Sequence, residues 1–209
     1  QSIEFQSGDG WIWGAQLEQS SYPTSYIPTS GTTTTRIADA ASKTGLSSVI
    51  NSPEGVLYLE VAALADDGTT RQLSLSDGSS ANNKLSIIYT STTNQIQAFV
   101  RASGSISFNE TFTLSSATSS NKIAIKWKLN DFALWVNGVE VDTDISGNAP
   151  IGLSKLSFDD ADGASNFYGK CQNLMVFPSA LTDDELADLT GAVHQTFNSL
   201  ATFYNYTIL

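Results

Sequence analysis

The segment from residue 122 to residue 143 constrains the fold of this chain more than any other. Its side chains alternate, with Ile123, Ile125, Trp127 and Leu129 on one side and Lys122, Lys126 and Lys128 on the other. Such alternation predicts a strand with one buried and one solvated face. A second strand follows a turn at residues 130–131, and Asn137-Gly138 is typical of a type I′ turn into a third. The segment therefore predicts a three-stranded antiparallel meander.

Further strand patterns separated by turn residues recur along the chain. Strands are predicted at residues 55–62, 71–76, 84–89, 94–100 and 203–208. A single helix is predicted, because Thr182 and Glu185 have the spacing of a capping box. We therefore expect an all-β, antiparallel two-sheet jelly-roll sandwich with one short helix near the C-terminal region. The 209 residues suffice for such a core.

The composition excludes several classes of function. Only 15% of the residues are charged and the net charge is -11, which would repel a phosphate backbone and argues against nucleic-acid binding. No window approaches the roughly 18 apolar residues of a membrane-spanning helix, so membrane insertion is not expected. The remaining polar surface is rich in Ser, Thr and Asn, which is compatible with hydroxyl-rich partners such as glycans.

The chain contains one cysteine and one histidine, which limits the disulfide, metal and catalytic chemistry that these residues can support. Cys171 cannot form an internal disulfide or a cysteine zinc cluster, and its apolar neighbourhood predicts a small buried residue. His194 follows the predicted helix without any nucleophile-elbow glycine pattern, so a surface or capping histidine is expected rather than a catalytic one.

The first 35 residues differ in character from the rest. Residues 11–18 read as an aromatic-rich strand, and residues 20–31 contain two prolines and many hydroxyls, which suits an extended connection. Residues 1–5 read as the end of an earlier strand, so we expect a fragment of a longer protein. The predicted division is a terminal strand and linker over residues 1–35 and a sandwich over residues 36–209.

Two stretches of the second part resemble the concanavalin-like lectin/glucanase and laminin-G-like superfamily. Residues 126–140 are similar to its central meander, with a strand that ends in an asparagine-glycine turn. Residues 167–186 are similar to its closing element, a glycine and a strand followed by a capped helical turn. The resemblance implies a sandwich over residues 36–209, and it says almost nothing about function.

The first part resembles a narrower group, the tail fibres and related virion proteins of tailed bacteriophages. Residues 13–18, 23–29 and 35–36 carry this similarity, together with the C-terminal residues 203–209. Environmental bacterial surface proteins share the segment. The resemblance implies a phage tail fibre or virion appendage used for host recognition, located on a virion or extracellular. Its partners would be a cell-surface glycan or polysaccharide and other virion proteins, and homotrimers are common among such fibres.

An acidic run in the third strand of the meander offers a candidate catalytic site. Laminarinase-type hydrolases of the superfamily carry a Glu-x-Asp-x-Glu run, and Glu140, Asp142 and Asp144 nearly match it. The last position is an aspartate here, and the run directly follows the turn at residues 137–138 instead of crossing a sheet centre. We therefore interpret it as the exposed face of an edge hairpin, and expect no enzyme activity.

A second acidic segment leaves two interpretations open. Asp159, Asp160 and Asp162 precede Gly163, and calcium prefers such oxygen ligands in tight loops. The superfamily resemblance also implies one calcium at a loop rim. Asp-Gly turns are equally the usual chemistry of hairpins, so the segment is either a structural turn or a calcium site.

Carbohydrate binding would use exposed aromatic rings with hydrogen-bonding side chains beside them. The candidates for stacking are Trp135, Tyr89 and Tyr168, with Asn166 as a hydrogen-bonding neighbour, and Trp11 or Trp13 in the first part. Trp127 shares a face with isoleucines and belongs to the core. The sequence thus favours a non-enzymatic carbohydrate-binding or adhesion module. The alternatives are a purely structural virion decoration or assembly domain, and a glycoside hydrolase or lyase acting on polysaccharide.

Overall fold

The computed structural model describes residues 16–18, 25–35, 41–79 and 81–191. The chain divides into two units, Gln1–Ala38 and Asp39–Leu209. In the first unit, residues 16–18 and 25–35 contain no strand, and the Ile27 backbone N–H donates to the Gln16 side-chain oxygen at 2.8 Å. The strands predicted at residues 11–18 and 203–208 lie mostly or wholly outside the described residues.

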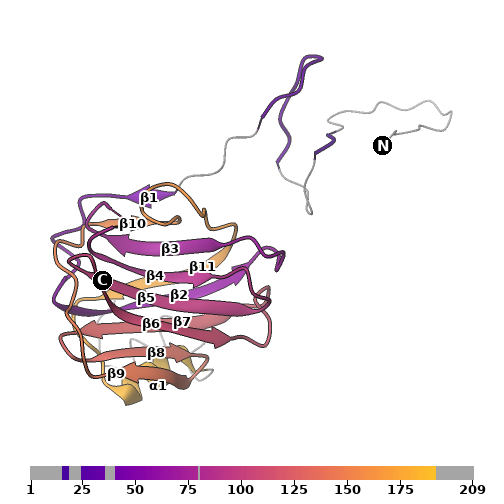
Figure 1. The fold of residues 1–209 in the computed structure, drawn as a ribbon. Helices are drawn as coiled ribbons and strands as arrows, with labels where there is room; N and C mark the ends of the chain where they lie inside the picture. Colours follow the sequence, from indigo (N-terminus) through magenta and orange to yellow (C-terminus); the bar gives the residue numbers. More distant parts are fainter. Residues whose placement is uncertain (1–15, 19–24, 36–40, 80, 192–209) are drawn as a thin grey trace, which may run out of the picture. The chain divides into compact units, whose positions relative to one another are not determined.

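The described part of the second unit folds into two antiparallel sheets (Figure 1). Sheet A has the order β1-β10-β3-β4-β5-β6, and sheet B has the order β11-β2-β7-β8-β9. The strands are Ser42–Lys43 (β1), Glu54–Ala63 (β2), Arg71–Ser76 (β3), Lys84–Tyr89 (β4), Gln95–Ala102 (β5), Ser105–Thr113 (β6), Asn121–Lys128 (β7), Phe132–Val136 (β8), Val139–Asp144 (β9), Lys155–Ser157 (β10) and Gly169–Phe177 (β11). This arrangement confirms the predicted all-β sandwich.

Alternating apolar residues of both sheets build the core between them. The largest fully buried side chains include Trp127 and Ile125 of β7, and Leu73 and Leu75 of β3. The Trp127 indole N–H donates to the Ser52 carbonyl at 3.0 Å, which satisfies its polar atom inside the core. Leu129, predicted on the same face, is instead 59% exposed, because β7 ends at residue 128 and the chain turns there.

The predicted meander is confirmed as β7, β8 and β9, adjacent in sheet B. Asn137 and Gly138 have φ values of 51° and 86°, as both central residues of a type I′ turn require. The Asn137 side chain also accepts from the Lys122 N–H at 2.9 Å, which ties the turn to β7. β9 is the edge strand of sheet B, as the edge-hairpin interpretation expects.

The helix α1, Asp183–Thr190, covers the outer face of sheet B. The predicted capping box is present: Thr182 Oγ1 accepts from Glu185 N, and Glu185 Oε2 accepts from Thr182 N at 2.8 Å. Its apolar face joins a second cluster of buried residues: Val56, Tyr58, Ala124, Ala133, Trp135, Leu186 and Leu189. None of the helices in the described part of the chain is long and apolar enough to cross a membrane.

Candidate functional site

The outer face of sheet A differs from that of sheet B because its side chains are polar. Strand register places Ser157 of β10, Ser74 of β3, Ser86 of β4 and Phe99 of β5 in one row. These side chains share a face because residues paired across antiparallel strands point the same way, opposite to Leu73, Leu75, Leu85 and Ile87 in the core. We call Ser157, Ser74 and Ser86 the serine row. All three are fully buried although they lie outside the core.

The connection between β10 and β11 covers part of this face. This 158–168 loop lies next to β3, where the Gln72 N–H donates to the Ser165 carbonyl at 2.9 Å. Ser74 Oγ donates to the Asp159 carbonyl at 2.8 Å, and Lys155 Nζ donates to the Ala161 carbonyl at 2.6 Å. A hydroxyl and an ammonium therefore hold the loop on the sheet through its backbone carbonyls.

Several buried polar atoms beside the loop have no hydrogen-bond partner within the described protein. They are Ser86 Oγ, Ser157 Oγ, Gln72 Oε1 and Asn166 Oδ1. An unpartnered buried polar group costs about 1–3 kcal/mol, so native structures retain few of them. These four atoms lie together on the outer face of sheet A, beside the 158–168 loop.

An aromatic ring and two cations continue the face beyond the serine row. The Phe99 ring is half-buried, with Lys84 Nζ at 5.6 Å and Arg101 Cζ at 5.1 Å from its centroid. Beside Phe99, the Gln97 amide donates to Asn109 Oδ1 at 2.6 Å. The sequence argument missed all five residues, although strict alternation in β4 and β5 places four of them opposite to the core, and Asn109 of β6 pairs with Phe99.

Two of the predicted stacking platforms are not available to a ligand. Tyr89 is 3% exposed, lies in the core and donates to the Val61 carbonyl at 3.4 Å; burial also raises its pKa. Trp135 is 6% exposed and packs in the cluster beneath α1. Neither ring presents an open face, so neither can be a stacking platform in this conformation.

The other predicted binding residues lie at the end of the 158–168 loop. Tyr168 is half-buried, and its carbonyl accepts from the Leu64 N–H at 3.0 Å. Asn166 forms an isolated parallel β-bridge with Gln72 of β3, which places its side chain beside the polar face described above. Of the four residues predicted for ligand binding, Asn166 is therefore the one that the structure places there. Trp11 and Trp13 lie outside the described residues.

The three aspartates predicted for calcium do not form a metal cage. Asp159 Oδ1 accepts from the Ala161 N–H at 2.7 Å, and Asp160 Oδ1 accepts from the N–H groups of Asp162 and Ala164, each at 3.0 Å. In the described part of the chain, no group of three or more His, Cys, Asp and Glu side chains could hold a metal ion. The carboxylates of Asp159 and Asp160 cap the turns of their own loop.

The acidic run of β9 lies on the other sheet from this polar face. Glu140 is exposed, and Asp142 shares a hydrogen bond with Glu110 of β6, the facing edge strand of sheet A. Burial, the bond to Asp142 and the charges of Asp142 and Asp144 raise the pKa of Glu110. Inward-pointing charges on edge strands are a common protection against edge-to-edge pairing.

The prediction of a buried cysteine is wrong. Cys171 is exposed on β11, the edge strand of sheet B opposite to β9, where a register shift interrupts the pairing with β2. The bulge and the edge position keep the thiol from the core. Burial of part of the side chain, and the nearby Glu60 charge, raise its pKa. His194 lies outside the described residues.

Comparison with known proteins reveals similarity in fold. No protein-family model matches the sequence, and no curated protein sequence does. The carbohydrate-binding module CBM40 of the Ruminococcus gnavus IT-sialidase superposes with a TM-score of 0.57 at 18% identity, over 69% of this chain and 86% of the module. The leech intramolecular trans-sialidase complexed with 2,7-anhydro-Neu5Ac gives 0.59 at 18% identity, over 76% of this chain and 27% of the enzyme.

A third neighbour comes from a different enzyme. Domain 4 of AbnA, a GH43 extracellular arabinanase from Geobacillus stearothermophilus in complex with arabinotriose, gives a TM-score of 0.52 at 14% identity, over 68% of each chain. At these identities the likeness concerns the fold alone. This chain therefore has the antiparallel two-sheet β-sandwich fold that these domains share.

Proposed function

We propose that this protein binds carbohydrate, without catalysis, on the outer face of sheet A. The observation that carries the proposal is the set of buried, unpartnered oxygens Ser86 Oγ, Ser157 Oγ, Gln72 Oε1 and Asn166 Oδ1 on one face. These oxygens are covered in this conformation, so a saccharide would reach them by displacing part of the 158–168 loop, and its hydroxyl groups could then donate to them. Phe99 adds a half-exposed ring of the kind on which a pyranose stacks, next to the carboxamides of Gln97 and Asn109.

The structural neighbours support this proposal. The CBM40 module is also known bound to α2,3 sialyllactose, and in that form it superposes with a TM-score of 0.55 at 19% identity. The arabinanase domain is in complex with arabinotriose. Two sugar-bound domains of the same fold make carbohydrate the first ligand class to test.

The position of the acidic run supports a role without catalysis. Glu140 and Asp142 lie on β9 at the edge of sheet B, away from the polar face of sheet A. Asp142 instead lies next to Glu110 of the other sheet, where its charge helps to raise the pKa of that residue. We therefore expect binding of polysaccharide without product release.

A glycan array combined with a depolymerisation assay tests the proposal. We expect specific array signals and no release of reducing ends. The double variant Gln97→Ala/Asn109→Ala should weaken binding at least tenfold, because each position removes a hydrogen-bonding amide from the face. Gln172→Ala, an exposed amide of β11 on sheet B, is the matched control and should bind like the wild type. Silence in both assays would favour a structural role, and Glu140-dependent product would favour a hydrolase.

The setting of this binding activity is part of the same proposal. The resemblance of residues 13–18 and 23–29 to phage fibre segments supports a virion appendage, or a similar extracellular surface protein, that recognises a host glycan. A homotrimer with other virion proteins as partners would present several weak sites together and raise the avidity. Sedimentation of the purified chain would test the oligomer, and adsorption of the labelled chain to host cells would test the recognition.

A further inference from the structure

Two like charges face each other directly across the polar face of sheet A. Lys84 of β4 and Arg101 of β5 are register partners, and Ser76 and Lys155 continue the same row. The row thus holds three of the ten basic residues of a chain with net charge -11. Like charges directly opposite each other destabilise a pair of strands. An arrangement that lowers stability, such as this pair of like charges, is expected at functional sites, where the function requires it.

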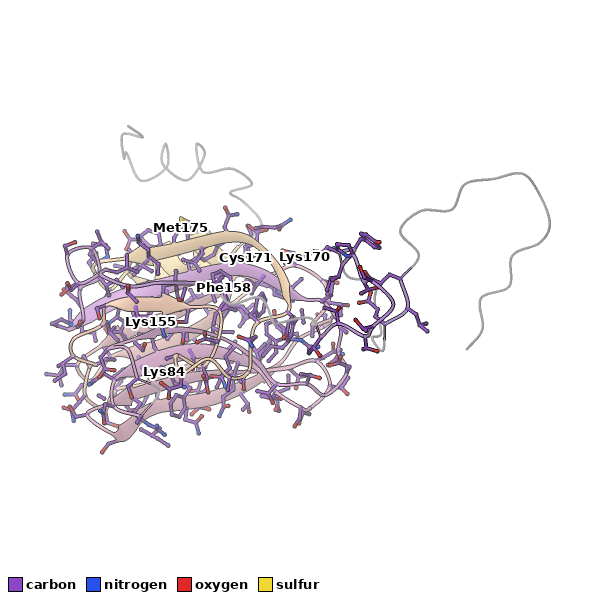
Figure 2. All side chains as sticks on the ribbon, turned by 90° about the horizontal axis from the view of Figure 1, so that it is seen from above. Lys84, Lys155, Phe158, Lys170, Cys171 and Met175 are labelled. Atoms are coloured by element: carbon purple, nitrogen blue, oxygen red, sulfur yellow. The ribbon has the colours of Figure 1, made fainter. Side chains whose placement is uncertain are left out.

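The two lysines of this row, Lys84 and Lys155, are labelled in Figure 2. Neither lysine forms an ion pair within the described part of the chain. Lys155 Nζ donates to the Ala161 carbonyl at 2.6 Å, and Lys84 Nζ donates to the Asp160 carbonyl at 3.5 Å. Both partners are neutral carbonyl oxygens.

Lys84 is the most constrained of these cations. It is 7% exposed, and burial lowers the pKa of its ammonium although the Asp160 and Asp162 charges act in the opposite sense. The Arg101 charge lowers the pKa further, which agrees with their direct pairing. A buried cation beside a second cation would gain strongly from an anion, since desolvated charges interact more strongly than exposed ones.

Phe99 supplies the apolar part of the same arrangement. Lys84 Nζ and Arg101 Cζ lie over its half-buried ring, 5.6 Å and 5.1 Å from the centroid, so a sugar would pack on the part of the ring that the two cations leave exposed. An acidic sugar combines the two matching features, a C–H face that packs on a ring and an anionic group. Arg is well suited to bind a carboxylate or sulfate through paired N–H groups.

We propose that the ligand of this face is an anionic saccharide, with its carboxylate or sulfate ester at Lys84 and Arg101 and its sugar ring against Phe99. The inference rests on the proposed carbohydrate binding and names the ligand class. It differs from a neutral-sugar site, in which Lys84 would only hold the 158–168 loop and Arg101 the Ala81 carbonyl.

Matched polymers that differ in charge test the inference. Polygalacturonate is compared with its fully methyl-esterified form, and a sulfated galactan with the same galactan after desulfation, by isothermal titration calorimetry. We expect the charged member of at least one pair to bind tenfold or more tightly and to weaken as salt is raised. The pair that responds distinguishes a carboxylate from a sulfate ester.

Charge-removing variants locate the effect. Arg101→Gln should weaken binding of the charged polymer roughly 10- to 100-fold, as expected for the loss of a hydrogen bond to a charged group. Arg101→Lys should retain part of the affinity. Lys170→Gln, which removes an exposed charge from β11 of sheet B, is the matched control and should leave affinity unchanged (Figure 2). Lys84→Gln also removes a loop contact, so its thermal unfolding is measured alongside.

The possible failures can be told apart. Equal binding of the charged and neutral polymers would overturn the inference and leave carbohydrate binding intact. Charge-dependent binding that survives Arg101→Gln but is lost in Lys170→Gln would place the anion on sheet B and overturn it as well. Binding of none of the polymers, together with a silent glycan array, would overturn the proposed function itself.

Discussion

Two serines that face each other across β3 and β4 should respond to the same substitution with opposite signs. Ser74 and Ser86 are register partners, and both are fully buried on the outer face of sheet A. Ser74 Oγ donates to the Asp159 carbonyl at 2.8 Å, whereas Ser86 Oγ has no partner within the described protein. The two positions therefore form an internal control for the cost of an unpartnered hydroxyl.

The magnitudes follow from this difference in partners. Ser74→Ala loses a buried hydrogen bond and leaves the Asp159 carbonyl short of a donor, which should cost about 1–2 kcal/mol in the free energy of unfolding. Ser86→Ala removes an unpartnered hydroxyl without changing the shape of the side chain, and should stabilise the protein by about 1 kcal/mol. For a chain of this size, the two melting temperatures should differ by roughly 4 to 12 °C.

Urea unfolding and thermal unfolding of both variants and the double variant measure the effect. The double variant should lie between the two single variants, with a coupling term because the side chains are neighbours. If Ser86→Ala loses 1 kcal/mol or more, the hydroxyl is satisfied in the folded protein. The argument for a polar binding face from unpartnered oxygens would then be refuted.

Four further predictions concern the fold and its pH and metal dependence. The pKa of Glu110 is higher in the folded than in the unfolded protein, so the free energy of unfolding should fall as pH rises from the ordinary glutamate pKa through the raised one. Urea unfolding from pH 4 to 8 measures this fall, and it should be absent in Glu110→Gln. Gly55→Ala should destabilise by several kcal/mol in chemical denaturation, because its Cβ would come within 2.5 Å of the Phe177 carbonyl oxygen. Thr182→Ala should lower the unfolding free energy by about 1 kcal/mol through loss of the cap, whereas Thr182→Ser should not. Millimolar calcium should leave the melting temperature unchanged, and a rise reversed by chelator would show that the 158–168 loop rearranges around the ion.

Local patterns were sufficient to predict most of the fold. The strand from Ile123 to Trp127, the turn at Asn137 and the cap at Thr182 each depend on neighbouring residues alone, and each is confirmed. The predicted solvated face of that strand is wrong, because α1 packs over it and Ala124 and Lys126 are buried. The alternation of side chains along the strand could also have excluded Tyr89 as a binding residue, because Tyr89 points to the same face as Leu85 and Ile87 of the core. The prediction that Cys171 is buried was wrong because its strand lies at a sheet edge and contains a bulge, and local hydrophobicity does not reveal either feature.

The candidate site could not be predicted in the same way because it depends on contacts between distant segments. The alternation of side chains along β8 places Trp135 on the outer face of sheet B, and only the packing of α1 over that face buries it. The serine row likewise becomes buried only because residues far along the chain fold back over β3. Lys84 and Arg101 become partners through a register that the hairpin length sets, and neither belongs to a recognisable motif. Such tertiary contacts leave no local periodic signal.

The two outer faces of the sandwich are covered by elements with different kinds of contact, and this difference bears on the proposed binding face. α1 covers sheet B through Leu186, Leu189 and other apolar side chains, so removal of the helix would expose apolar surface to water. The 158–168 loop covers sheet A through a serine hydroxyl and two ammonium groups that donate to its carbonyls. Sugar hydroxyls or an anionic group can replace such contacts with bonds of the same kind. Phe158 and Phe167 of the same loop pack against the core, so a ligand that replaces only the polar contacts must leave these two rings in place.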